Sequence, residues 1–427
     1  MTQTAEKRNP WVWIPSLYFA QGLPYVVAMT VSVIMFKRMG ISNTDIALYT
    51  SWLYLPWVIK PLWSPLVDIL KTKRYWIVVM QLLVGASLAG VALTLPGSDF
   101  FRWSLAFLWL LAFSSATHDI AADGFYMMGL SKHDQAFFVG IRNTFYRLAM
   151  LSGQGLLVVF AGYFEQKTGD IPTAWSLTFY MLAVLFVLFF IYHLFMLPRP
   201  VEDREQQASG VSDVISAFLS TFVSFFKKPQ ARVAIAFMLL FRLGEAQLVK
   251  MASPFLLDAR EVGGLGLTTS DIGFIYGTAG IVALTLGGIM GGVVVARFGL
   301  KKWLWPLALA LNVPNLVYVA MAIWQPTSLA WITSGVVLEQ FGYGFGFTAY
   351  MLFMIYFSDG PNKTAHYAIC TGFMALGMML PGMISGFIQE FVGYRDFFIW
   401  VVLCTLPGFA LLPMLKIDPA FGTRHAK

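Results

Sequence analysis

Charged side chains are scarce in this sequence. Only 12% of its 427 residues are Asp, Glu, Lys or Arg, whereas 58% are hydrophobic and the mean hydropathy is +0.69. A soluble globular protein carries about 25% charged residues. Because a chain with so few charges cannot cover a hydrophobic core with a polar surface, its composition excludes a soluble domain of any size.

Cysteine and the common catalytic patterns are also scarce. Both cysteines, Cys370 and Cys404, lie in apolar runs, which favours buried thiols over a disulfide framework. The sequence has no Gly-rich loop followed by Lys-Ser/Thr, so ATP is not expected to drive it, and no Cys/His spacing typical of a metal site. These absences predict a protein that is not an enzyme and that has no cofactor or metal.

Long apolar segments, in contrast, recur from end to end of the chain. A run of 18 or more apolar residues is long enough to cross a bilayer as a helix. We therefore predict an all-α polytopic membrane protein. Twelve transmembrane helices are expected, at residues 11–36, 45–67, 75–95, 103–128, 135–163, 174–197, 231–256, 270–296, 303–323, 329–357, 366–391 and 396–415.

The distribution of Lys and Arg predicts the orientation of these spans. An even number of spans places both termini on one side, where the loops and tails hold seventeen Lys and Arg residues, against six on the opposite side. Positive residues favour cytoplasmic loops, so both termini are expected in the cytoplasm. The net charge of +7 then has a topological explanation and does not indicate a nucleic-acid partner.

The longest loop, residues 198–230, divides the spans six and six. It separates a predicted N-terminal bundle at 1–197 from a predicted C-terminal bundle at 231–427. The later part of the loop, VSDVISAFLSTFVSFFKK, repeats apolar residues at the spacing of an amphipathic helix. We expect this helix to lie along the cytoplasmic membrane surface as a linker.

The two predicted bundles repeat short motifs. GISNTDI at 40–46 returns as GLTTSDI at 266–272, and both copies have the Ser/Thr-x-x-Asp spacing of a helix capping box. A second pair, SPLVDILKTKR at 64–74 and GVVVARFGLKK at 292–302, resembles the loop motif G-x-x-x-D-R-x-G-R/K-R/K of the Major Facilitator Superfamily. The resemblance implies two pseudo-symmetric six-helix bundles, a monomer, and cytoplasmic loops that help to hold one conformation. The loop residues concerned are Asp68, Lys73, Arg74, Arg297, Lys301 and Lys302.

Ionisable side chains inside the spans are candidates for function, because a charge at membrane depth faces a cavity or a partner. In SSATHDIAADGFY at 114–126, Asp119 and Asp123 are spaced i, i+4 and share one helix face. If spans four and five form an antiparallel hairpin, Asp123 lies level with Arg142 and Asp119 with Arg147. These residues then form two structural ion pairs, or Asp119, about 15 Å from the cytoplasmic boundary, binds protons.

The second half carries its own ionisable residues. Arg242 and Glu245 are spaced i, i+3 in span seven, where an internal ion pair is one explanation. Glu339, in the middle of span ten, has no base at its depth on span eleven and requires a partner elsewhere, a substrate contact or a proton. Lys60 and Lys250 are expected to extend toward the membrane surfaces. The candidate proton-coupling residues are Asp119, Asp123, Glu339 and Glu245.

The candidate substrate-binding residues lie on spans that line the cavity in this superfamily. Aromatic rings with polar tips suit the C–H faces of sugars, although Trp and Tyr also pack helices and anchor interfaces. His118, which points about 100° away from Asp119, either tunes the acidic site or bonds to a neighbouring helix. The candidates are Gln21, Tyr25, Trp52, Trp57, His118, Tyr126, Arg142, Tyr146, Arg147, Arg242, Tyr343 and Tyr350.

Within the superfamily, the chain resembles the AmpG muropeptide-permease family, which belongs with the acetyl-CoA transporters. Asp119 and Asp123 match the family motif Gln-Asp-x-x-x-Asp, whereas His118 replaces its Gln. The segments that carry the resemblance are LYFAQGLPY at 17–25, KPLWSPLVD at 60–68, ATHDIAADGFY at 116–126, HYAICTGFMALG at 366–377 and GYRDFF at 393–398.

This resemblance implies a secondary active transporter of the bacterial inner membrane that works by alternating access. It implies import of a cell-wall-derived muropeptide or another N-acetylated saccharide, driven by the proton gradient. Import of an iron-chelating siderophore and export of drugs remain open as alternatives, whereas a membrane sensor is disfavoured because no soluble part is present to signal. The expected partners are a small-molecule substrate and the lipid bilayer.

Overall fold

The computed structural model describes residues 8–130, 132–200, 203, 211–360 and 362–422. These residues are almost entirely helical and include no β-strand. Each of the twelve predicted spans coincides with one or more helices. Within the described residues, eight helical stretches are long and apolar enough to cross a membrane, namely Pro10–Arg38, Lys73–Thr94, Phe100–Gly129, Gly140–Thr168, Ile171–Met196, Thr269–Phe298, Leu300–Trp324 and Ala365–Met414.

The remaining predicted spans are helical too. Predicted span 45–67 consists of α3 (Asn43–Trp52) and α4 (Leu55–Leu70), and 231–256 consists of α11 (Ala231–Leu240) and α12 (Leu243–Leu257). Predicted span 329–357 is the single helix α17 (Leu329–Ser358). The last two predicted spans both lie in Ala365–Met414, where α18 (Lys363–Leu403) is bent at Gly393, whose φ is 77°.

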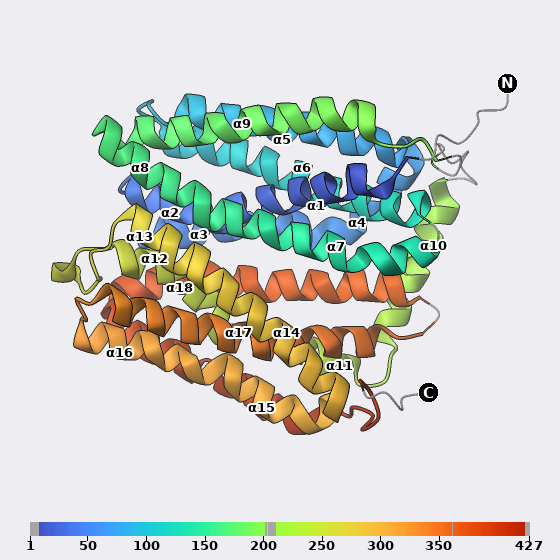
Figure 1. Cartoon of the computed structure of the whole chain (residues 1–427). Coiled ribbons are helices and arrows are strands. Elements are labelled where there is room, and N and C mark those ends of the chain that lie inside the picture. Colours follow the sequence, from blue (N-terminus) through green and yellow to red (C-terminus); the bar gives the residue numbers. More distant parts are fainter. Residues whose placement is uncertain (1–7, 131, 201–202, 204–210, 361, 423–427) are drawn as a thin grey trace. The chain divides into compact units, whose positions relative to one another are not determined.

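Packing divides the chain into two units, of which unit 1 contains residues 1–35 and 59–216. It contains the whole of α1 (Pro10–Val26), η1 (Val27–Val31), α5 (Lys73–Thr94), α6 (Phe100–Gly129), α7 (Lys132–Met150), η2 (Leu151–Leu157), α8 (Val158–Thr168) and α9 (Ile171–Met196). It also contains the start of α2 (Ser32–Arg38), most of α4 and the first part of α10 (Val211–Phe226). Within this unit α1 packs against α6 and α7, and α5 packs against α6 and α9 (Figure 1).

Unit 2 contains residues 36–58 and 217–427. Besides α3, α11, α12, α17 and α18, it contains η3 (Arg260–Val262), α13 (Thr269–Ile272), η4 (Gly273–Ala279), α14 (Gly280–Phe298), α15 (Leu300–Asn312), η5 (Val313–Asn315), α16 (Leu316–Trp324), α19 (Leu406–Leu411) and η6 (Leu412–Met414). Here α17 packs against α14 and α15 (Figure 1), and α18 packs against α3 and α12. The division at 1–197, 198–230 and 231–427 stays a prediction from the sequence repeat.

The repeated capping motifs start helices, as predicted. Ser42 Oγ accepts the backbone N–H of Asp45 at 3.1 Å at the start of α3. At the start of α13, Thr268 and Asp271 form a complete capping box, with bonds of 3.2 Å and 3.0 Å. These side chains satisfy N–H groups that the first turn of a helix leaves without partners, so both acids have a structural role.

Glycines let α17 approach its neighbours at backbone distance. A Cβ at Gly344 would lie 2.0 Å from the backbone oxygen of Leu284 in α14, and one at Gly346 would lie 2.2 Å from that of Leu307 in α15. Real Cβ atoms do not come so close to a carbonyl oxygen, so only glycine allows both contacts. Close backbone approach through small residues is a common way to pack helices in membranes.

Several spans contain an irregular segment. Spans one, five and eight contain the π-helical turns η1, η2 and η4. Predicted span seven is interrupted at Phe241 and Arg242, where α11 ends and α12 begins. Such interruptions are frequent at functional sites because they free backbone groups and redirect side chains.

The amphipathic segment after the long loop forms the predicted helix, α10. Its end packs on unit 2 through Phe225, which is fully buried and lies 5.4 Å from the ring of Phe357. Ser224 Oγ lies 2.9 Å from His366 Nε2 at the start of α18. The last turn of α10 is therefore anchored to protein, while its placement on the membrane surface stays a prediction.

Candidate functional site

The candidate proton-coupling residues lie in two groups, one in each unit. In unit 1, Asp119 and Asp123 extend from one face of α6, as their spacing predicts. Lys60 Nζ of α4 lies 3.7 Å from Asp119 Oδ2. The Asp119 side chain is 13% exposed and that of Lys60 is 28% exposed, so this ion pair is loose and only partly shielded from solvent. The expectation that Lys60 extends to the membrane surface was wrong, because it turns toward an acid on α6.

Asp123 is held by Arg142 and Tyr18. Arg142 places a guanidinium nitrogen 3.3 Å from Asp123 Oδ1, and the Tyr18 hydroxyl donates to the same oxygen at 3.3 Å. The guanidinium carbon of Arg142 lies 4.6 Å from the ring centre of Tyr18 and 5.1 Å from that of Tyr126. A cation between two aromatic rings and beside a carboxylate is well fixed in position, so this cluster ties α1, α6 and α7 together.

The predicted pairing of Asp123 with Arg142 is confirmed, although the reason for it differs. The prediction assumed that spans four and five are direct neighbours, whereas α7 packs mainly against α1, which also packs against α6. The Arg142 side chain of α7 therefore passes over the ring of Tyr18, a residue of α1, to contact Asp123 on α6. Tyr146, one turn further along α7, lies within electrostatic range of Asp119 and Asp123.

His118 lies on another side of α6, in a buried chain of hydrogen bonds. Its Nε2 lies 3.1 Å from Gln81 Nε2 of α5, and the other amide atom of Gln81 lies 2.9 Å from His193 Nδ1 of α9. His193 Nε2 lies 2.9 Å from Ser16 Oγ of α1. Hydrogen bonds between these polar groups thus connect four helices. Of the two roles predicted for His118, the structure shows the bonding to a neighbouring helix.

Arg242 is the centre of the group in unit 2. It directly precedes α12 at the interruption of span seven and is 6% exposed, and its guanidinium donates to the hydroxyl of Tyr343. The guanidinium carbon lies 4.8 Å from the ring centre of Phe347 and 6.0 Å from that of Tyr350. Tyr350 donates from its hydroxyl to the backbone oxygen of Met238 at 2.6 Å. The cation therefore sits against an aromatic face of α17.

Two buried carboxylates accompany Arg242. Glu245 is 0% exposed and Glu339 is 1% exposed. Glu245 interacts electrostatically with Arg242, and Glu339 with Glu245. Glu339 Oε2 accepts from Gln340 Nε2 at 3.0 Å, whereas within the described ranges Glu339 Oε1 and both carboxylate oxygens of Glu245 have no hydrogen-bond partner. Two enclosed acids beside one Arg favour binding of a cation such as a proton, because buried charge must be compensated.

The other candidate residues have varied surroundings. Gln21 is 8% exposed, and its Oε1 finds no hydrogen-bond donor in the described part of the chain. Trp52 is 38% exposed, while Tyr25, Trp57 and Arg147 are half-buried. Their assignment to substrate binding stays a prediction.

Comparison with known families is decisive at the level of the superfamily. The model of the Major Facilitator Superfamily matches residues 16–384. The chain belongs to the Major Facilitator Superfamily. It is therefore a multi-pass membrane transporter and not an enzyme.

Similar superfamily members carry transporter names. The chain is 26% identical over 412 residues to "Putative transporter AmpG 4" of Rickettsia conorii, covering 94% of this chain and 95% of that protein. It is 25% identical over 403 residues to "Anhydromuropeptide permease" of Escherichia coli K12, covering 93% of this chain and 77% of that protein. The predicted resemblance to AmpG-type transporters is confirmed.

Solved superfamily structures share the fold. The nucleoside transporter NupG has a TM-score of 0.71 at 17% identity, with 96% of this chain and 100% of NupG covered. A D-xylose-proton symporter has a TM-score of 0.68 at 12% identity, with 96% and 98% covered. At such identities the likeness concerns the fold.

The two copies of the superfamily loop motif have different surroundings. At the first copy, the backbone N–H groups of Lys73 and Arg74 donate to the carboxylate of Asp203 at 2.6 Å and 3.0 Å, while the side chain of Asp68 lies outside what the structure describes. At the second copy, Arg297 and Lys302 both lie over the ring of Phe298, at 5.4 Å and 5.6 Å, and Lys301 is exposed. The linker thus supplies an acid to the N-terminus of α5, where negative charge is favourable.

Sequence reasoning missed Lys60 and Tyr18 as members of the acidic cluster in unit 1. Lys60 belongs to KPLWSPLVD and Tyr18 to LYFAQGLPY, two of the segments that resemble the AmpG family. The presence of Lys60 inside an apolar span therefore indicated that it has a partner there. The sequence could not identify that partner, because it depends on which helices pack together.

Proposed function

We propose that this transporter is a proton-coupled importer of a cell-wall-derived muropeptide or another N-acetylated saccharide, and that it works by alternating access. The names of its AmpG-type relatives support the substrate class. We propose the bacterial inner membrane as its location, with both termini in the cytoplasm, and the proton gradient as its source of energy.

The loose pair of Lys60 and Asp119 is the observation that supports proton coupling most directly. A carboxylate with low exposure, in the second half of the membrane helix α6, is a favourable place for a proton. When Asp119 is protonated, its attraction for Lys60 is lost, and the ammonium group becomes available to a negatively charged group of the substrate. When Asp119 loses the proton, it competes with the substrate for Lys60 and favours release.

The group in unit 2 supplies a second place for protons in this proposal. Glu245 and Glu339 repel each other when both are ionised, and Arg242 compensates only one negative charge. Binding of one proton to the pair restores neutrality. Arg242, Tyr343 and Tyr350 then offer a cation and aromatic faces to the sugar rings of a substrate.

Substitution of Asp119 tests the coupling. Asp119→Asn is expected to abolish proton-driven uptake into proteoliposomes while the purified protein still binds the substrate, because the amide keeps the shape but cannot take up the proton. Asp99→Asn is a matched control, since Asp99 is exposed at the start of the same helix and makes no capping bond. Proton-driven uptake by the Asp119→Asn protein at the parent rate would rule out Asp119 as the coupling site.

A ligand screen separates the substrate classes. Muropeptides and amino sugars are expected to raise the thermal unfolding midpoint of the purified protein, since a ligand that binds only the folded state stabilises it. Stabilisation by siderophores alone, or by unrelated hydrophobic drugs, would instead support the alternative importer or an exporter.

A further inference from the structure

The two buried acids of unit 2, Glu245 and Glu339, lie among further polar groups that the proposed function does not use. We call these two residues the acid pair. Asn315 is 1% exposed and Tyr318 is 0% exposed. Among the described residues, neither amide atom of Asn315 has a hydrogen-bond partner, and the Tyr318 hydroxyl has none either. Because an unpaired polar group is unfavourable when it is buried, these atoms indicate a ligand.

The glycines of α17 show what Glu339 faces. Gly335, Glu339 and Gly342 are spaced four and three residues apart, so they share one face of the helix. A Cβ at Gly335 would lie 2.6 Å from the side chain of Val317, and one at Gly342 would lie 2.7 Å from that of Pro314. Glu339 lies between these two levels and therefore faces η5 and the start of α16.

Tyr318 connects this stretch with both acids. It interacts electrostatically with Glu339 and with Glu245. Its ring centre lies 6.3 Å from that of Phe255, which belongs to α12, the helix of Glu245. Asn315, the last residue of η5, precedes Tyr318 by three positions. Oxygens without a protein partner thus come from η5, α12, α16 and α17 to one buried region.

Helix interruptions surround the acid pair. Span seven is interrupted at Arg242, three residues before Glu245, and η5 interrupts span nine. The π-helical turn η4 of span eight carries Tyr276, which interacts electrostatically with Glu339 and Glu245. Interrupted membrane helices free backbone carbonyl oxygens, and such oxygens bind Na⁺ together with side-chain oxygens.

The charges of the region favour a monovalent cation. Two ionised carboxylates beside the Arg242 guanidinium leave one negative charge. Lys250, further along α12, donates to Thr50 Oγ1 at 2.9 Å instead. The described part of the chain contains no group of three or more His, Cys, Asp or Glu side chains that could hold a metal ion, which disfavours a divalent ion. A single positive charge would restore neutrality.

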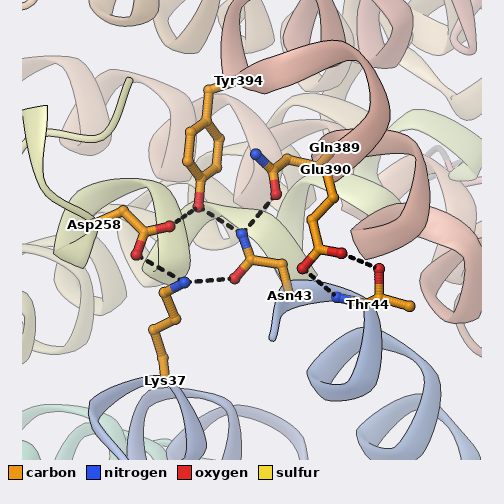
Figure 2. Close-up of polar contacts among 7 residues, drawn as sticks. All are labelled: Lys37, Asn43, Thr44, Asp258, Gln389, Glu390 and Tyr394. Carbon is orange, nitrogen blue, oxygen red and sulfur yellow. Dashed lines mark hydrogen bonds and ion pairs between the residues drawn. The ribbon is translucent and has the colours of Figure 1, made fainter. Parts of the chain in front are cut away.

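Other acids of unit 2 have a partner for each oxygen (Figure 2). Glu390 accepts from the Thr44 hydroxyl at 2.5 Å with one oxygen and from the Thr44 backbone N–H at 3.2 Å with the other. Asp258 Oδ1 lies 2.7 Å from Lys37 Nζ, and Asp258 Oδ2 accepts from the Tyr394 hydroxyl at 2.6 Å. In contrast, three of the four oxygens of the acid pair lack a hydrogen-bond partner in the described ranges.

We propose that the acid pair binds a sodium ion, with Asn315 Oδ1 and the Tyr318 hydroxyl oxygen as neutral ligands. Carboxylates favour Na⁺ over K⁺, because the smaller ion approaches more closely and is attracted more strongly. The inference rests on the proposed function and deepens it: Na⁺ competes with a proton for the negative charge of the acid pair, while Asp119 keeps the coupled proton.

Thermal unfolding of the purified protein tests the site without any substrate. Sodium chloride is expected to raise the unfolding midpoint above its value in potassium chloride at the same concentration, because an ion that binds only the folded state stabilises it. Glu339→Gln should abolish this difference. Tyr318→Phe should weaken Na⁺ binding by roughly tenfold without lowering the midpoint in potassium chloride, since the hydroxyl that it removes has no partner among the described residues.

Glu390→Gln is the matched control, because it neutralises an acid of the same unit whose oxygens are both occupied. It should keep the response to Na⁺ even if the midpoint in potassium chloride falls. Equal midpoints of the parent protein in the two salts, or an unchanged Na⁺ response in the Glu339→Gln protein, would overturn the proposal. Buried water would then account for the unpaired atoms.

Retention of radioactive sodium by the purified protein measures binding directly. We expect one ion per chain, displaced by Li⁺ but not by K⁺. Retention of Na⁺ by a protein that does not carry muropeptides would support the ion site and contradict the proposed substrate. Proton-driven muropeptide uptake by a protein that retains no Na⁺ would overturn the ion site and leave the proposed function intact.

Discussion

At the residue scale, the two acids of α6 differ in the cation beside them and in its distance. Asp123 shares one oxygen between Arg142 and Tyr18, and two aromatic rings fix the Arg. Asp119 meets Lys60 at 3.7 Å, beyond ordinary hydrogen-bond length. A proton must bind and leave in each cycle, and the long contact with Lys60 supports our proposal that coupling lies at Asp119 and structural support at Asp123.

Lys60 provides the prediction at this scale. Lys60→Met is expected to reduce uptake strongly, because it removes the ammonium group that pairs with the ionised Asp119. Lys60→Arg keeps the positive charge and is expected to retain substantial uptake. Since the pair is partly exposed, the effect on the free energy of unfolding should stay below about 1 kcal/mol.

The measurements are uptake into proteoliposomes and the thermal unfolding midpoint, with Lys167→Met as the control at an exposed position on α8. A fall in the unfolding midpoint that fully accounts for the lost uptake would reduce Lys60 to a structural role.

At the scale of single elements, the irregular helices position the charged groups. Arg242 projects from the break between α11 and α12, and Glu245 occupies the first turn of α12, where the helix dipole favours an acid. α17 brings Glu339 to the same group and packs against its neighbours through glycine. The shape of α17 is thus required for the site in unit 2.

Gly344 gives the prediction for this element. Gly344→Ala should lower the free energy of unfolding by about 1–3 kcal/mol, because the added methyl group overlaps the backbone oxygen of Leu284 and forces α14 away. Gly292→Ala on α14 is the control, since a Cβ there meets nothing within 4 Å. Thermal unfolding in detergent measures both, and equal midpoints for the two variants would show that α14 yields without strain.

At the scale of the whole molecule, the orientation in the membrane follows from Lys and Arg in the loops. Glu261→Cys, in the exposed connection between α12 and α13, should be labelled by an impermeant maleimide in intact cells. Asp359→Cys, between α17 and α18, should be labelled only after the membrane is permeabilised. The reverse pattern would place the termini outside the cytoplasm.

The sequence by itself determined the number of helical spans, the helix starts at Ser42 and Thr268, and the common helix face of Asp119 and Asp123. These features depend on hydrophobicity, on spacing along one helix and on local capping, all of which are written within a few turns of the chain. The contacts of Asp119 with Lys60, of Arg242 with Tyr343, and of Lys37 with Asp258 were decided only by the tertiary structure. They join residues 59 to 221 positions apart, and a polar group inside a membrane protein takes whichever partner the packing of its helix brings within reach.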